Sequence, residues 1–117
     1  MSDARLTALL DDIIELLQQH PGDEAVWLVA TRHLLAEDEP AALRRLNSAR
    51  MWGGAGSVAN QAMADNPGLD DWSWQMHIRE FRERMIELGE WLREQGETYP
   101  DIGTWIMAFN SWNQSER

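Results

Sequence analysis

Apolar residues recur along most of this chain at steps of three and four, and that spacing constrains the fold more than any other feature of the sequence. In a helix with 3.6 residues per turn, residues so spaced lie on one face, which a core can cover. A first run of this kind falls within residues 6–17, and a second spans two heptads. We therefore expect helices over about residues 3–19 and 71–95. The second run consists of Ile78, Phe81, Met85, Leu88 and Leu92.

Turn-forming residues divide the sequence between these two runs into shorter helices. The stretch His20-Pro21-Gly22-Asp23 ends the first helix, and Glu37-Asp38-Glu39-Pro40 ends the next one. Ser57 can cap a short helix, because its hydroxyl can accept a hydrogen bond from a free amide of the first turn. Additional helices are therefore expected over about residues 23–36, 40–51 and 58–64.

The helix expected over residues 23–36 has one apolar side. Val26, Trp27, Ala30 and Leu34 form that side, with Leu35 open as a further member, and we expect this side to be buried. Asp23 stands at the start of this helix and is expected to cap it.

The last apolar stretch, residues 102–112, is open to two interpretations. Its spacing favours a helix capped by Asp101, while a buried strand is the alternative, because aromatic residues and isoleucine also favour sheets. A chain of 117 residues fits one domain. The predicted fold class is all-α, a compact single-domain bundle (residues 1–117) of four to five helices with a Gly-rich connection in the middle.

Charge narrows the possible partners. Twenty acidic residues stand against ten arginines and no lysine, which gives a net charge of −10. Nucleic acids and anionic membrane surfaces are themselves polyanions, so direct binding to either is disfavoured. A basic protein partner is favoured electrostatically, although the same charge can simply keep a protein in solution.

Missing residue types exclude further classes of protein. The sequence has no cysteine, which excludes disulfides, thiolate nucleophiles and cysteine-based zinc sites. No apolar run approaches the roughly 18–20 residues that span a bilayer, and the start lacks the pattern of a signal peptide. We expect a cytoplasmic protein of unknown oligomeric state.

No motif for catalysis, cofactor or metal binding emerges. The loop Gly53–Gly56 lacks the strand before it and the lysine after it that a phosphate-binding loop needs, and a tight structural connection is the simpler interpretation. His20, His33 and His77 form no pair at helical spacing, and His77 with Glu80 is more simply a surface contact. We predict no catalytic, cofactor-binding or metal-binding residue, and therefore no enzyme.

Seven tryptophans are the clearest oddity of the composition. Tryptophan is enriched at the centres of protein interfaces, because it buries a large area at low entropic cost. Trp52 and Trp72, which lie near loops or helix starts, are the interface candidates, and closing the ends of the core is the alternative. The predicted contact set joins them to two acidic groups. Its members are Asp11, Asp12, Glu15, Glu37, Asp38, Glu39, Trp52 and Trp72.

The segment Ala49 to Asn60, ARMWGGAGSVAN, follows two leucine-rich acidic helices and resembles a family of small bacterial helical proteins of uncharacterised function. The resemblance implies a helical N-terminal half, a Gly-Gly-x-Gly-Ser segment and a C-terminal helix. It covers about residues 6–95, and the tryptophan-rich tail departs from it. In size and charge the chain also resembles the immunity proteins that accompany bacterial toxins, a likeness that transfers no catalytic residue.

These observations lead to one expected function and three alternatives. We expect an immunity-type inhibitor that occludes the basic active face of a toxin by steering and aromatic anchoring. An acidic nucleic-acid mimic, such as a phage counter-defence inhibitor, would need carboxylates spaced like phosphates. A small ligand-binding or enzymatic domain would need a pocket holding His77 or the glycine loop. An oligomeric scaffold would use the apolar seam of residues 78–92.

Overall fold

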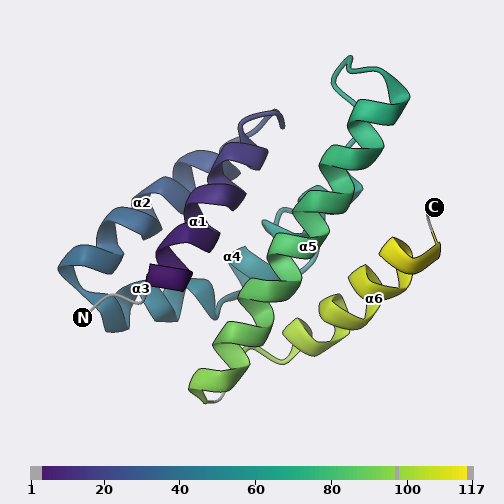
Figure 1. Cartoon of the computed structure of the whole chain (residues 1–117). Coiled ribbons are helices and arrows are strands. Elements are labelled where there is room, and N and C mark those ends of the chain that lie inside the picture. Colours follow the sequence, from purple (N-terminus) through teal and green to yellow (C-terminus); the bar gives the residue numbers. More distant parts are fainter. Residues whose placement is uncertain (1–3, 97, 116–117) are drawn as a thin grey trace.

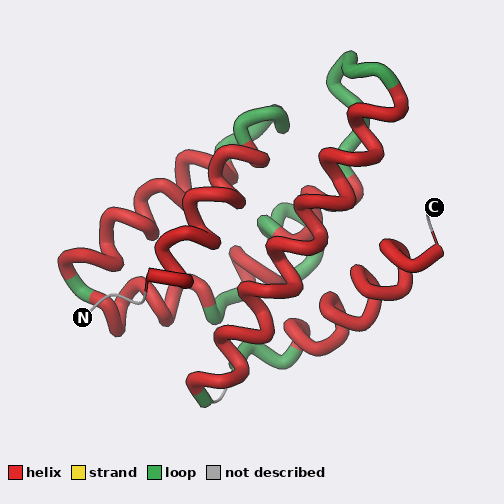
Figure 2. Tube along the Cα trace, in the orientation of Figure 1, coloured by secondary structure: helices red, strands yellow, loops and turns green. Residues whose placement is uncertain are grey.

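The computed structural model describes residues 4–96 and 98–115, and within these ranges every regular element is a helix (Figures 1 and 2). The all-α prediction is confirmed, but the helix count is higher than the predicted four to five. The predicted helix over 40–51 is divided at Asn47 and Ser48 into α3 and α4. The elements are α1 (Ala4–Leu17), α2 (Glu24–Glu37), α3 (Glu39–Leu46), α4 (Ala49–Trp52), the 3₁₀-helix η1 (Ala59–Met63), α5 (Asp71–Gln95) and α6 (Asp101–Ser115).

Helix α5 is the centre of the arrangement. It packs against α1 on one side and α6 on the other, while α2 packs on α1 and on α3 (Figure 1). Its 25 residues give a length of about 38 Å at 1.5 Å per residue, close to the long dimension of the 40 × 26 × 25 Å molecule. The N-terminal end of α5 and the loop before it project beyond the other helices (Figure 2). We call this projecting end, residues 65–76, the tip.

The seams predicted for α1 and α5 are buried, as the spacing requires. The core includes the leucines and isoleucines of α1 together with Phe81, Met85 and Leu88 of α5. Helix α6 confirms the helical interpretation of residues 102–112, and Ile102, Ile106 and Phe109 are buried. Gly89 lets α6 approach α5 closely, because a Cβ there would lie 2.9 Å from Ile106 Cδ1.

The face predicted for α2 is correct only in part, since Trp27 and Leu34 are partly buried against the core but other members of the face are not. Val26 is 71% exposed and Ala30 is also exposed, whereas Leu28, Thr31 and Leu35 are buried. Burial of Thr31 is possible because its hydroxyl donates to Trp27 O (3.0 Å) and accepts from Arg45 Nε (2.8 Å).

The cap predicted for the same helix is wrong. Asp23 makes no side-chain cap hydrogen bond, and its carboxylate instead accepts a hydrogen bond from Arg50 Nη2 at 2.7 Å. The arginine beside it holds the pKa of Asp23 below its ordinary value.

The glycine-rich connection orders the chain between α4 and η1. Gly54 and Gly56 have positive φ angles of 129° and 85°, which L side chains rarely adopt. Ser57 lies one residue before Val58, the N-cap of η1, and its hydroxyl accepts from Asn60 N at 3.2 Å, so the predicted hydrogen bond forms although Ser57 is not the cap residue. Trp52, one of the two predicted interface tryptophans, is 0% exposed, and its indole N–H donates to Leu46 O at 2.7 Å. That prediction is therefore wrong, since a fully buried side chain belongs to the core.

No helix in the described part of the chain is long and apolar enough to cross a membrane.

Candidate functional site

The predicted acidic contact residues lie in two separate places. Asp11, Asp12 and Glu15 are exposed on α1, but Asp11 pairs with Arg32 (3.0 Å) and Asp12 pairs with Arg84 (3.7 Å). Surface pairs of this kind contribute little to stability, yet they reduce the charge that a partner would meet.

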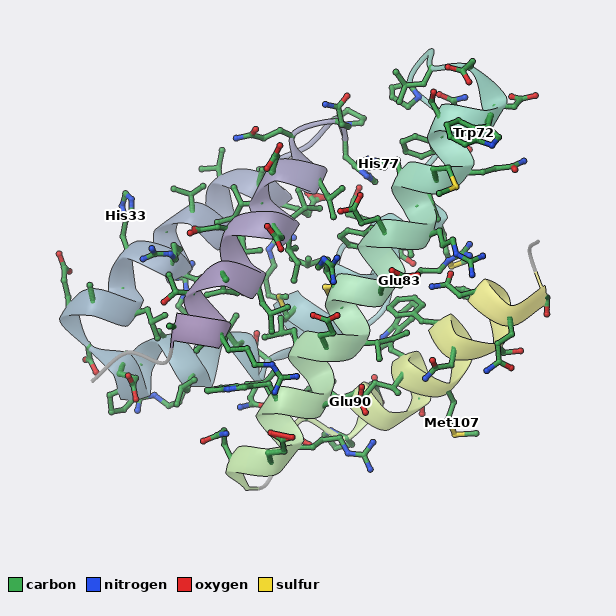
Figure 3. The ribbon with its side chains drawn as sticks, in the orientation of Figure 1. His33, Trp72, His77, Glu83, Glu90 and Met107 are labelled. Atoms are coloured by element: carbon green, nitrogen blue, oxygen red, sulfur yellow. The ribbon has the colours of Figure 1, made fainter. Side chains whose placement is uncertain are left out.

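The second acidic group lies at the turn between α2 and α3. Glu37 and Asp38 are exposed there and Glu39 is half-buried. Asp38 also caps α3, because its carboxylate accepts from Ala41 N at 3.2 Å. In Figures 1 and 3 this turn lies at the opposite end of the molecule from Trp72. Two points are never closer in space than they are in a picture, so this turn and Trp72 are far apart. The predicted contact residues therefore do not form one surface.

Trp72 is the predicted contact residue whose position suits binding best. It is 70% exposed near the start of α5, close to the 46% exposed Met76 and the 38% exposed Leu69. Trp72 and Met76 stand four residues apart and so share a helix face. We call Leu69, Trp72 and Met76 the tip patch. Large apolar side chains gathered in the open are typical of interaction sites.

Three carboxylates lie close to the tip patch in the sequence. Asp65, Asp70 and Asp71 are exposed next to it in the chain, and no arginine occurs between Arg50 and Arg79. Asp70 caps α5, and the hydrogen bonds from Ser73 hold the pKa of Asp70 below its ordinary value, so the carboxylate stays charged. None of these three acids forms an ion pair within residues 4–96 and 98–115. The tip therefore combines three negative charges with an exposed aromatic.

An open groove of about 1170 Å³ leads from the tip patch along α5 toward α6. Trp72 and Met76 line one end of the groove, and Asn110 and Asn113 of α6 line the opposite wall. Arg82 lies in its lining, where its guanidinium donates to Asn113 Oδ1 at 3.2 Å and lies 5.3 Å from the centre of the Trp112 ring. The groove thus offers apolar surface beside fixed polar groups, as binding sites commonly do.

A second cluster was not predicted from the sequence. His20, in the turn after α1, and His77, on α5, approach each other so that their Nε2 atoms lie 2.8 Å apart. The Trp74 ring stacks on His77 with centroids 5.1 Å apart, and Phe81 lies beside His20. The two histidines are 57 residues apart in the chain, so no spacing rule could have paired them.

The hydrogen bonds around His20 fix where its proton lies. Gln61 Nε2 donates to Glu24 Oε1 at 2.8 Å, so Gln61 Oε1 is directed to His20 Nδ1 at 3.1 Å. An amide oxygen only accepts, so His20 carries its proton on Nδ1 and presents the lone pair of Nε2. His77 then donates from its own Nε2 to complete the chain of hydrogen bonds.

Both imidazoles favour the neutral form. Burial lowers the pKa of His20 below its ordinary value of 6.5, the neighbouring His77 lowers it further, and the Gln61 hydrogen bond raises it in part. Burial also lowers the pKa of His77, while the Glu80 carboxylate opposes that shift. His77 borders a hollow of about 330 Å³ that Asp12, Glu15 and Glu80 also line.

Comparison with known proteins identifies no relative, since no family model, curated protein or solved structure matches this chain.

Proposed function

We propose that this protein is an inhibitory binding protein of the immunity type, and that it recognises a basic protein partner through the tip. The observation that carries the proposal is the 70% exposure of Trp72 within a group of three carboxylates that lack an arginine partner in the described part of the chain. An exposed tryptophan of this kind is suited to fill a pocket on a partner, where it would lose most of its contact with water.

Charge and apolar surface have different roles in this proposal. The carboxylates Asp65, Asp70 and Asp71 would speed the encounter with a cationic surface, because opposite charges steer diffusing proteins together. Trp72 and Met76 would then slow dissociation by burying apolar area. The acids of α1 and of the α2–α3 turn contribute only to the overall field.

The arrangement of charge favours a compact binding site over a mimic of nucleic acid. A mimic would need a row of unpaired carboxylates along one surface. On α1, however, Asp11 pairs with Arg32 of α2, and Asp12 pairs with Arg84 of α5. Unlike the α2–α3 turn, the tip combines its acids with large exposed apolar side chains.

The proposal is tested with the protein encoded by the neighbouring reading frame as the candidate partner. Association and dissociation rates would be measured for the wild type, for Trp72→Ala, and for Met107→Ala. Met107 is the matched control, since it is 74% exposed on the outer side of α6, away from the tip (Figure 3). We expect Trp72→Ala to weaken binding by roughly thirtyfold or more, an effect typical of an interface anchor, and Met107→Ala to change it less than about twofold.

A second experiment tests the role of the carboxylates in association. The double variant Asp65→Asn/Asp71→Asn leaves the Asp70 cap intact and should lower the association rate at low salt, with the difference shrinking as salt is added. Association of the wild type that is indifferent to salt, or equal binding by Trp72→Ala and the wild type, would contradict the proposal.

A further inference from the structure

The histidine pair has the geometry of two metal ligands that face each other. The Nε2 atoms of His20 and His77 point at one another from two different segments, the α1–α2 turn and α5. In a tetrahedral zinc site with Zn–N distances of about 2.0–2.1 Å, two such nitrogens lie about 3.4 Å apart. The observed 2.8 Å would therefore need to widen by roughly half an ångström, within the reach of small side-chain rotations.

The groups behind His20 have the arrangement of a second coordination shell. A histidine that binds metal through Nε2 commonly donates its Nδ1–H to a carbonyl or carboxylate, which fixes the ring and the tautomer. Here Gln61 Oε1 accepts from Nδ1 at 3.1 Å, and Glu24 in turn holds the Gln61 amide at 2.8 Å. These contacts set His20 in the tautomer whose Nε2 carries a lone pair, which accepts from His77 here and could instead bind a cation.

The surroundings of His77 favour a cation as well. Its ring is only half-buried and borders the hollow that Asp12, Glu15 and Glu80 line, so the pair adjoins a negatively charged opening on the His77 side. Only Asp12 of these acids has an arginine partner, Arg84, within the described residues. No group of three or more histidine and carboxylate side chains in residues 4–96 and 98–115 is placed to hold a metal together. The protein therefore offers two nitrogen ligands, and the other positions of the ion are open to water.

We propose that His20 and His77 form a two-imidazole binding site for a divalent transition-metal ion, with Zn²⁺ as the representative of the class. Imidazole pairs suit zinc, copper and nickel, whereas Mg²⁺ and Ca²⁺ prefer oxygen ligands. Binding would replace the hydrogen bond between the rings with two metal–nitrogen bonds, and His77 would move its proton from Nε2 to Nδ1. The ion would connect the α1–α2 turn to the N-terminal part of α5.

The experiment uses the full chain, freed of metal with a chelator, and Zn²⁺ as the probe. Calorimetric titration would compare the wild type with His77→Gln and with His33→Gln. His33 is the matched control, because it is exposed on the outer side of α2 (Figure 3). We expect one Zn²⁺ per chain for the wild type and His33→Gln, and at least tenfold weaker binding for His77→Gln. Equal binding by all three proteins, or no binding by the wild type, would overturn the proposal.

A second measurement needs no variant and so does not depend on whether His77→Gln folds. Ring nitrogen NMR signals would be followed as Zn²⁺ is added to the wild type. The Nε2 signals of His20 and His77 should shift together at one equivalent, and those of His33 should not. Addition of Mg²⁺ at the same concentration should shift none of them. If His33 shifts with the other two, or if His20 and His77 stay unchanged, the histidine contact is a hydrogen bond alone.

Discussion

The two halves of α5 carry large apolar residues at similar helical spacing, yet they meet different surroundings. From residue 81 onward, Phe81, Met85 and Leu88 are 0% exposed between α1 and α6. In the first two turns, Trp72 and Met76 point to solvent or line an open groove. The covered half has a structural role that its burial explains. The uncovered half has apolar surface that the fold does not use, and this difference is the basis for assigning the tip to binding.

The largest expected effect is on the covered half. Leu88→Ala would remove buried methyl groups and leave a cavity, which should lower the free energy of unfolding by about 2–5 kcal/mol. Trp72→Ala should change it by less than about 0.5 kcal/mol, because its side chain is mostly in solvent. Urea denaturation of both variants checks the contrast. A large loss of stability in Trp72→Ala would mean that the tip supports the fold after all.

The contact between α5 and α6 gives the next effect. A leucine at Gly89 would collide with Ile102 and Ile106, whose nearest atoms lie 3.1 Å and 2.9 Å from the position of an added Cβ. Gly89→Leu should therefore lower the free energy of unfolding by about 1–3 kcal/mol, the usual cost of overpacking. Thermal melting followed by circular dichroism measures the loss. An unchanged melting temperature would show that α6 can move away from α5 without cost.

The histidine pair predicts that the free energy of unfolding depends on pH. Its member on α5, His77, lies between the exposed and the buried part of that helix. The pKa values of His20 and His77 are both lowered in the folded protein, so between those values and 6.5 the unfolded state binds more protons. In metal-free protein, the free energy of unfolding should thus be highest above pH 6.5 and should fall as the pH drops through the folded pKa values. Urea denaturation at several pH values measures this slope. The double variant His20→Gln/His77→Gln should flatten it and His33→Gln should not; a slope that persists in the double variant would assign the effect to other groups.

The smallest effect concerns a glycine with room around it. An added Cβ at Gly103 in α6 meets no atom within 4 Å, in contrast to Gly89. Gly103→Ala should raise the free energy of unfolding by about 0.5–1 kcal/mol, because alanine favours the helix over glycine. A decrease, measured by the same melting experiment, would mean that α6 needs the freedom of glycine at this position.

Local patterns predicted the parts of the fold in which one helix face is clearly apolar. The bounds of α5 were predicted to the residue, and for residues 102–112 the spacing favoured the helix that α6 forms over the strand that was left open. The buried face of α2 was predicted only in part, because apolar residues occur all around this helix. Their spacing therefore does not distinguish the buried Leu28 from the exposed Val26. Its buried face depends on Arg45, which reaches back from α3 to Thr31.

The candidate sites were harder to predict from the sequence than the helices, because they depend on how the helices pack together. Exposure of Trp72 follows from its place at a helix start, which the sequence indicated, whereas Trp52 is buried because Leu46 O and α6 enclose it. The histidine pair forms only when α1 and α5 pack together, and no local pattern contains that information.

The most direct test of the account is a map of the bound surface by NMR. Amide signals of the protein would be compared before and after addition of the candidate partner encoded by the neighbouring reading frame. We predict that the largest changes fall on residues 65–79, with little change at the α2–α3 turn around Asp38. Changes centred on that turn, with Trp72 unaffected, would contradict the assignment of binding to the tip.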